Sequence, residues 1–121
     1  MSEYSFQLTG RIPSKKNSRI STRSGRSFPS KKYGEWHVDA SQQLNHLAGE
    51  GIDYPVAIGY YFYLPDNRRT DLSNKIESIN DLLVDIGFIE DDNAKVLSEL
   101  HVYYMGVDKT APRCNVVISQ L

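Results

Sequence analysis

Four stretches of the chain alternate apolar and polar residues with the period of two that a half-buried β-strand requires, namely residues 4–10, 56–64, 95–105 and 113–120. The clearest is 56–64, which is rich in β-branched and aromatic residues and is closed by Pro65. Gly10 and Pro13 end the first strand. The last two strands follow one another closely, so we predict that they form an antiparallel hairpin through residues 106–112.

Two other stretches repeat apolar residues at every third or fourth position, as amphipathic helices do. The first helix is expected at residues 30–48, with Ser30 as a possible N-terminal cap and Gly49 at its end. The second is expected at residues 72–86, and Gly87 follows it where a left-handed C-terminal cap belongs.

Residues 11–29 are rich in Ser, Arg, Lys and Gly and are predicted to be a loop. The order of elements is then strand, helix, strand, helix, strand, strand. Such an order predicts an α/β fold of the α+β kind, with a two-layer mixed sheet and two main helices. A chain of 121 residues suits one domain, 1–121, with a basic loop at 11–32 inside it.

The composition is that of an ordinary globular protein, with 40% hydrophobic and 24% charged residues. The single cysteine, Cys114, cannot form an internal disulfide, and its place on a predicted strand favours a core role over a nucleophilic one. The longest apolar stretch is far shorter than the roughly 18 residues of a membrane-spanning helix. The first residues do not resemble a secretion signal. We therefore expect a cytoplasmic protein.

Charge is distributed unevenly along the chain, although the net charge is only −1. Residues 1–34 contain eight basic groups and one acidic group, whereas the remainder contains six basic and fourteen acidic groups. A basic segment joined to an acidic body favours a polyanionic partner, because basic clusters attract phosphate whatever the overall charge. The alternative is a solvated basic loop without a partner.

Carboxylates flank the second predicted helix. Asp71 lies at its start, and Asp91 and Asp92 follow its end. The helix spans about 20 Å, so these groups meet only if the chain after Gly87 doubles back along it. Together they would form an oxygen-rich site suited to Mg²⁺ or Mn²⁺. The alternative is that Asp71 caps the helix and the later pair lies in a solvated turn.

Several short motifs follow one another along the chain: Pro-Ser-Lys-Lys-Asn at 13–17, Gly-Arg-Ser-Phe at 25–28, Arg-Arg-Thr-Asp-Leu-Ser-Asn at 68–74, Asp-Leu at 81–82, Gly-Phe at 87–88 and Asp-Asp at 91–92. In order and spacing they resemble the RusA family of Holliday-junction resolvases over nearly the whole chain. The resemblance implies a homodimeric endonuclease, dependent on Mg²⁺ or Mn²⁺, that binds four-way DNA junctions and nicks two strands symmetrically in recombination and repair. It implies no small-molecule cofactor and no membrane partner, and such proteins are often encoded by phages or prophages.

The family motif Asp-x-Asp-Asn-x-x-Lys, followed later by Asp-Asp, is partly kept. Its first aspartate, its asparagine and its later pair correspond to Asp71, Asn74, Asp91 and Asp92. The resemblance therefore implies that Asp71, Asp91 and Asp92 hold the metal whose bound water attacks the phosphodiester.

Two positions depart from the motif. Ser73 stands where the family has its second aspartate, and Glu77 stands where it has its lysine. These two residues are neighbours on one helical face, so Glu77 is a candidate metal ligand and catalytic residue in place of the missing aspartate. The missing positive charge could come from Lys75, Lys95 or Lys16, and Lys75 is included among the catalytic candidates. We expect these departures to affect catalysis more than junction binding.

Phosphate contacts are expected from the basic segment and from the two arginines at 68 and 69. The candidates are Lys15, Lys16, Asn17, Arg19, Arg23, Arg26, Lys31, Lys32, Arg68 and Arg69. On a helical wheel Glu77, Asp81 and Asp85 face away from the apolar stripe of the second helix. They form either an acidic solvent stripe or a stripe offset by a cation or a basic partner.

Other residue types favour ordinary structural roles. His37, His46 and His101 lack the spacing of a zinc site. The aromatic run at 60–63 fits sheet packing or a dimer interface better than base stacking.

Three functions remain open from the sequence. The first is an active junction resolvase. The second is a protein of the same fold that grips branched DNA but is impaired in catalysis by Ser73 and Glu77. The third is a small protein-interaction domain whose basic loop meets an acidic partner.

Overall fold

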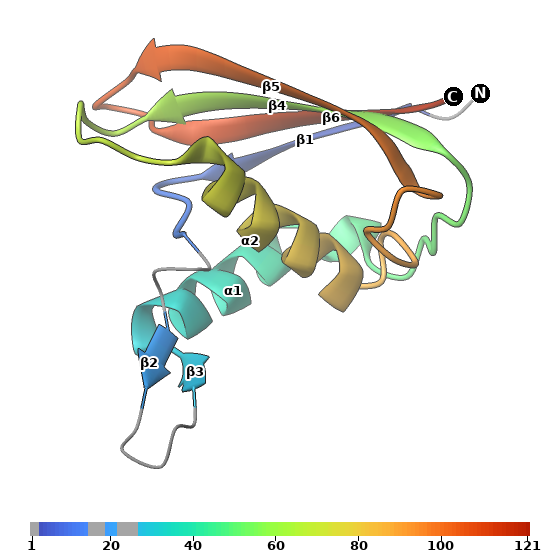
Figure 1. The fold of residues 1–121 in the computed structure, drawn as a ribbon, viewed down its shortest axis with the longest axis horizontal. Coiled ribbons are helices and arrows are strands. Elements are labelled where there is room, and N and C mark those ends of the chain that lie inside the picture. Colours follow the sequence, from blue (N-terminus) through green and yellow to red (C-terminus); the bar gives the residue numbers. More distant parts are fainter. Residues whose placement is uncertain (1–2, 15–18, 22–26) are drawn as a thin grey trace.

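Two helices lie across one face of a four-stranded mixed sheet (Figure 1). A computed structural model describes residues 3–14, 19–21 and 27–121, with the backbone alone at 19–21 and 27–29. The elements are β1 (Glu3–Thr9), β2 (Arg19–Ser21), β3 (Ser27–Pro29), α1 (Lys31–Gln43), η1 (Asn45–Leu47), β4 (Val56–Leu64), α2 (Leu72–Asp85), β5 (Leu97–Val107) and β6 (Arg113–Gln120). The predicted α+β architecture and the order of its main elements are confirmed.

The strands of the main sheet lie in the order β1-β6-β4-β5. Helix α2 carries the chain from the end of β4 back to the other end of the sheet, so β5 runs parallel to β4 (Figure 1). Strand β6 then lies between β1 and β4, antiparallel to both. The predicted hairpin between the last two strands is therefore wrong, because β5 and β6 lie on opposite sides of β4.

The apolar residues of β6 show its position in the sheet. Cys114, Val116 and Ile118 are completely or almost completely buried. Most residues of β5 are exposed on both faces. Both strands are rich in apolar residues, so burial follows position in the sheet: β6 pairs with β1 and β4 on its two sides, whereas among the described residues β5 pairs with β4 alone.

The predicted loop at 11–29 contains two short strands that sequence periodicity missed. Strands β2 and β3 pair antiparallel, with Arg19 opposite Pro29 and Ser21 opposite Ser27. They stand apart from the main sheet, near the start of α1 (Figure 1). Strands of three residues are too short to show a reliable alternation of apolar and polar positions.

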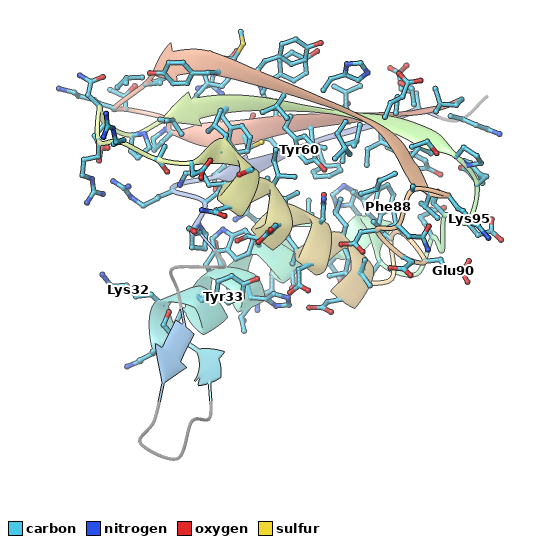
Figure 2. The ribbon with its side chains drawn as sticks, in the orientation of Figure 1. Lys32, Tyr33, Tyr60, Phe88, Glu90 and Lys95 are labelled. Carbon is cyan, nitrogen blue, oxygen red and sulfur yellow. The ribbon has the colours of Figure 1, made fainter. Side chains whose placement is uncertain are left out.

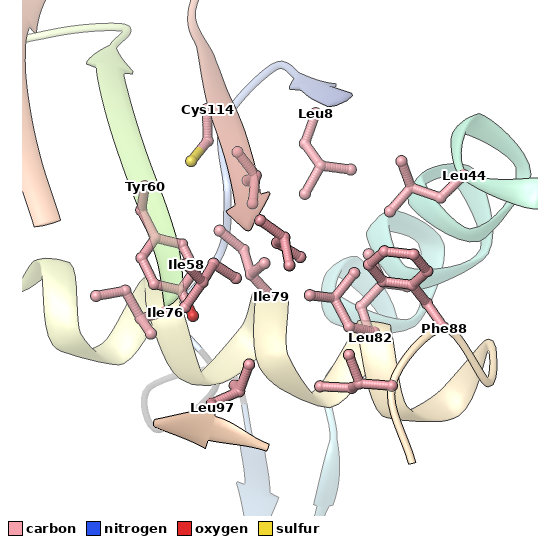
Figure 3. Packing of buried hydrophobic residues seen from close by; sticks show 14 of the residues in the cluster. Leu8, Leu44, Ile58, Tyr60, Ile76, Ile79, Leu82, Phe88, Leu97 and Cys114 are labelled. Atoms are coloured by element: carbon pink, nitrogen blue, oxygen red, sulfur yellow. The ribbon is translucent and has the colours of Figure 1, made fainter. Parts of the chain in front are cut away.

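The core lies between the sheet and the helices (Figure 3). Alternate residues of β4, from Val56 to Leu64, point into it, and α2 covers them with its apolar stripe, including Ile76, Ile79, Leu82 and Leu83. The Tyr60 hydroxyl is also buried here, and it donates a hydrogen bond to the Asn80 side-chain carbonyl. The strand predicted at 56–64 and the helix predicted from residue 72 are confirmed. The predicted core position of Cys114 is also confirmed.

Helix α1 begins as predicted, because the Ser30 hydroxyl accepts a hydrogen bond from the Tyr33 amide at 3.2 Å. It ends earlier than predicted, at Gln43, and the 3-10 turn η1 continues to Leu47. Val38, an apolar residue of this helix, is nonetheless 60% exposed. In the described part of the chain, neither helix has the length and apolar character to span a membrane.

The end of α2 is closed by Gly87, which adopts φ 75°. The Gly87 amide donates to the Val84 carbonyl and the Phe88 amide donates to the Leu83 carbonyl, both at 3.0 Å, which is the bonding of a Schellman cap. The Phe88 ring is fully buried and packs edge-on against Tyr4, with 5.1 Å between ring centroids. The predicted left-handed cap is confirmed, and Phe88 ties it to the sheet.

Asp108 organises the crossing from β5 to β6. Its carboxylate accepts hydrogen bonds from the Thr110 hydroxyl, the Thr110 and Ala111 amides and the Arg113 guanidinium. The Arg113 bond, followed by the Thr110 hydroxyl, lowers the pKa of Asp108 to about 2. This carboxylate therefore holds the segment that carries the chain past β4.

We expect Asp108→Asn to lower the melting temperature at neutral pH, because the amide cannot replace the charge-assisted bonds. The pKa of Asp108 is depressed in the folded state, so its stabilising effect is present above the unfolded value near 3.8 and is lost as the pH falls toward about 2. Melting curves of both proteins from pH 7 to pH 2 should therefore converge at the acidic end. Asp53→Asn, at an exposed position before β4, is the control. A gap between wild type and Asp108→Asn that is constant down to pH 2 would contradict this assignment.

Candidate nucleic-acid interface

A groove of about 520 Å³ opens at the end of the sheet where β1 and β4 finish. It is bounded by residues 11–14, the start of α1, the loop after β4 and the first turns of α2. Five of its lining residues are basic: Arg11, Lys32, Arg68, Arg69 and Lys75. One acidic residue, Asp66, also lines it. The lining is therefore strongly cationic and suits an anionic ligand.

Asp66 fixes the positions of two of these basic side chains. Its carboxylate accepts bonds from the Arg68 amide at 3.0 Å and from the Arg68 and Arg11 guanidinium groups. These bonds, led by that from the Arg68 amide, lower the pKa of Asp66, so the group stays ionised. Asp66 thus holds two arginines in place at the groove.

Lys75 and Ser78 fasten the chain at the start of the basic segment to α2. The Lys75 ammonium donates to the Ile12 carbonyl, and the Ser78 hydroxyl donates to the Pro13 carbonyl at 2.7 Å. Lys75 is 5% exposed. Burial lowers its pKa, and the positive charge of Arg11 lowers it further. Both residues therefore fix where the segment after β1 leaves the body of the protein.

Asp71 follows the groove-lining Thr70 and occupies the N-cap position of α2, but its side chain makes no capping hydrogen bond. The carboxylate is exposed and instead accepts a bond from the Ser73 hydroxyl at 3.1 Å. The alternative that Asp71 caps the helix through its side chain is therefore wrong. An exposed carboxylate beside a cationic groove remains able to bind a ligand.

Asp91 and Asp92 lie beyond the opposite end of α2. Phe88 and Ile89 do not begin a return along the helix, because they pair with residues 51–52, with the Ile52 amide 2.9 Å from the Phe88 carbonyl. The Asp91 carboxylate accepts bonds from the Asp92 amide at 2.7 Å and the Asn93 side chain at 3.1 Å, so it forms an exposed turn. The length of α2 therefore separates these two residues from Asp71 within one chain.

The chain was compared with known proteins. It is 28% identical over 102 residues to the crossover junction endodeoxyribonuclease RusA of Aquifex aeolicus (strain VF5), which is 84% of this chain and 79% of that protein. No protein-family model matches the chain. The resemblance to the RusA family is confirmed.

The two departures from the RusA motif lie close to Asp71. Ser73 contacts Asp71 directly through its hydroxyl, so it occupies the place of the missing aspartate without supplying a carboxylate. Glu77 is exposed one turn further along α2. Lys75, considered as a substitute for the family's lysine, is bonded to the Ile12 carbonyl.

Several of the phosphate-binding candidates from the basic segment lie outside the described residues, namely Lys15, Lys16, Asn17, Arg23 and Arg26. Only the backbone of Arg19 is described. Of the others, Lys32, Arg68 and Arg69 line the groove, whereas Lys31 lies 3.8 Å from Glu35 on the next turn of α1. The structure therefore brings three of the described candidates together.

The acidic stripe of α2 faces α1 rather than open solvent alone. Asp81 accepts a bond from the Tyr33 hydroxyl at 3.4 Å, and Asp85 lies 2.8 Å from the His37 ring. Atoms of His37, Asp81 and Asp85 lie within 4.8 Å of one another, the one such group among the described residues. Burial and then Asp81 raise the pKa of Tyr33 to about 12. Sequence spacing missed this group because its members come from two helices.

The aromatic run of β4 packs within the sheet. Tyr60 is buried, Tyr61 stacks on Tyr103 of β5 with 4.7 Å between centroids, and Tyr63 lies under Arg113 at 3.7 Å. Burial raises the pKa of the Cys114 thiol to about 12, which disfavours the reactive thiolate. These residues therefore support the fold.

We expect Ser78→Ala to destabilise the protein by about 1 kcal/mol, because it removes the bond to the Pro13 carbonyl from a fully buried position. Urea unfolding measures the change. Ser5→Ala, at an exposed position on β1, should change stability much less. Equal effects of the two substitutions would show that the hydrogen bond from Ser78 to the Pro13 carbonyl contributes nothing to the free energy of unfolding.

Proposed function

We propose that this protein is an endonuclease that binds four-way DNA junctions and cuts them as a homodimer with the help of Mg²⁺ or Mn²⁺. The similarity to RusA of Aquifex aeolicus supports the reaction class. The observation that carries the proposal is the cationic groove with Asp71 beside it at the start of α2. A cytoplasmic location fits a protein that acts on DNA recombination intermediates.

The groove supplies the DNA-binding part of this function. Arginine and lysine side chains neutralise backbone phosphates, and Arg69 and Lys32 are exposed at the groove. Arg68 and Arg11 are oriented by Asp66. The basic segment leaves the body of the protein beside this groove, held there by Lys75 and Ser78. Together they offer phosphate contacts over a broad surface.

Carboxylates Asp71, Asp91 and Asp92 suit a divalent metal chemically, because Mg²⁺ and Mn²⁺ prefer oxygen ligands. They do not suit it as one cluster within a single chain, because α2 lies between them. We therefore assign Asp71, with Glu77 nearby, to one protomer and Asp91 or Asp92 to its partner. When bound there, the metal supplies an activated water and stabilises charge on the phosphate.

A second candidate is a branched-DNA-binding protein that is impaired in cutting. It is favoured by Ser73, which contacts Asp71 but adds no carboxylate. It differs from the first candidate in one measurable property, which is metal-dependent cleavage.

The deciding experiment incubates the purified protein with a labelled four-way junction in Mg²⁺ or Mn²⁺, beside linear duplex. We expect paired symmetric nicks in the junction that chelation abolishes. Asp71→Asn and Asp91→Asn should each lose at least two orders of magnitude in rate, whereas Asp53→Asn, an exposed carboxylate elsewhere, should cut normally. Junction-selective binding without nicks would establish the second candidate, and neither binding nor cutting would reject both.

Co-expression of Asp71→Asn and Asp91→Asn chains tests whether a site is shared between protomers. In a mixed dimer one shared site contains both substitutions and the other contains neither. We therefore expect single nicks to return, although each variant alone is inactive. If both aspartates acted within one chain, the mixture would stay inactive.

Salt dependence tests the role of the groove. Each phosphate contact contributes close to one unit to the slope of log affinity against log salt. We expect Arg69→Ala to weaken junction binding and reduce this slope by about one. Lys109, an exposed lysine between β5 and β6 that does not line the groove, is the control as Lys109→Ala, whereas Lys32, labelled in Figure 2, does line it. Equal slopes for Arg69→Ala and the wild type would remove Arg69 from the interface.

A further inference from the structure

A second hollow, of about 360 Å³, adjoins the cationic groove. The loop after β4 lines both, and it contributes Arg68, Arg69 and Thr70 to each. The groove extends from this loop toward the chain after β1, whereas the hollow extends toward the end of β5. Because β1 and β5 are the two edges of the sheet (Figure 1), the loop lies between the groove and the hollow. A ligand that crosses the loop therefore contacts both.

One side of the hollow is apolar and is formed by Leu64, Leu72 and Tyr104. Leu64 is almost buried and Leu72 is partly buried, whereas Tyr104 is 57% exposed, the highest value among the tyrosines. Helix α2 begins at Leu72 and leaves this part of β5 uncovered. Within the described part of the chain, the Tyr104 side chain has no hydrogen-bonding or aromatic partner. Its ring is therefore free to stack on a planar ligand.

The other side of the hollow is polar and positively charged. The Asp66 carboxylate accepts a bond from the Arg68 amide at 3.0 Å and from the Arg68 Nε at 3.1 Å. Among the described residues the Arg68 guanidinium has no other partner, so its terminal amino groups remain able to donate. Arg69 and Thr70 are exposed beside it. Donors held in this way suit the acceptor atoms of phosphates and of base edges.

These two sides together fit a nucleotide. The faces of a nucleobase are apolar and stack on aromatic rings, its edge carries hydrogen-bond acceptors, and its phosphate is anionic. A purely apolar ligand would leave the arginines unpaired, and a simple anion would make no use of Tyr104. The volume of the hollow lies within the range of about 300–1,000 Å³ that is typical of small-molecule sites, so a whole base has room.

We propose that the hollow binds an unpaired base of the DNA, stacked on Tyr104, while the phosphate of the same strand lies on Arg68 and Arg69 in the groove. The inference rests on the proposed function and deepens it, because it adds a site for a base to a surface for phosphates. Thr70 lines both depressions and directly precedes Asp71. A base held in the hollow therefore brings the adjoining phosphate beside Asp71.

Such a site distinguishes a four-way junction from linear duplex. Taking a base out of a stacked duplex costs free energy, and the cost is lowest for a base that is not paired. Bases at the branch point lie where the helices separate, so they leave the stack more readily than bases inside a continuous duplex. The hollow thus directs Asp71 to the branch point.

A scan with abasic DNA tests the site. Labelled junctions each lack the base at one position near the branch point, in both symmetry-related strands, and fluorescence anisotropy without divalent metal measures affinity while nothing is cut. We expect the loss of one particular base to weaken binding by the wild type about tenfold, because stacking on the ring is lost. Tyr104→Ala should weaken binding of the intact junction equally, and the same abasic position should weaken it no further.

Two variants are controls. Tyr104→Phe keeps the ring and should bind as the wild type does. Tyr103→Ala removes the neighbouring ring, which stacks on Tyr61 on the opposite face of the sheet. It should bind the intact junction normally and keep its sensitivity to the abasic position. Circular dichroism and light scattering should show the same fold and mass for Tyr104→Ala as for the wild type.

The contrary results are distinct. Additive losses from Tyr104→Ala and from every abasic position would overturn the proposal, as would equal weakening by Tyr104→Phe. A changed mass of Tyr104→Ala would overturn it by assigning the ring to a contact between chains. A wild type that binds and cuts junctions equally well whichever base is absent would keep the nuclease function and reject the base site. A wild type that binds no junction would reject the proposed function and the base site together.

Discussion

The packing of α2 on β4 is the contact on which the rest of the structure depends. It buries the apolar stripe of the helix against alternate residues of the strand, and each fully buried Leu or Ile contributes about 1.5–3 kcal/mol. A polar contact between the helices, such as that from the His37 ring to the Asp85 carboxylate, contributes about 1 kcal/mol. Apolar packing, rather than polar contacts between the helices, therefore holds α2 in place.

The consequences extend to the functional surfaces. Because α2 returns the chain along β4, β5 is parallel and lies at the sheet edge, and β6 takes the buried position on the other side. The same helix puts Asp71 at one end of the sheet and Asp91 at the other. It also presents Lys75 and Ser78 to the chain after β1. One helix thus positions the groove, separates the acidic groups and leaves an apolar edge uncovered.

That separation bears on the proposed function. We propose that a metal site built on the carboxylates of the RusA resemblance takes Asp71 from one chain and Asp91 or Asp92 from another. A nuclease that acts symmetrically on a four-way junction also benefits from a two-fold assembly, because the junction presents equivalent strands to both protomers. The separation of the acidic groups within one chain is therefore compatible with the proposed function.

Local patterns in the sequence were sufficient for the main elements. The period of two predicted the exact bounds of the strands Val56–Leu64 and Arg113–Gln120, and the spacing of apolar residues predicted α2. Ser30 and Gly87 marked helix ends, because capping depends on neighbouring backbone groups. The motifs also identified the family resemblance. Only tertiary structure decided that β6 lies between β1 and β4, that Asp71 and Asp91 stay apart, and that His37 meets Asp85. These outcomes depend on which apolar faces, far apart in sequence, are buried together. The local spacing of apolar residues does not determine that choice.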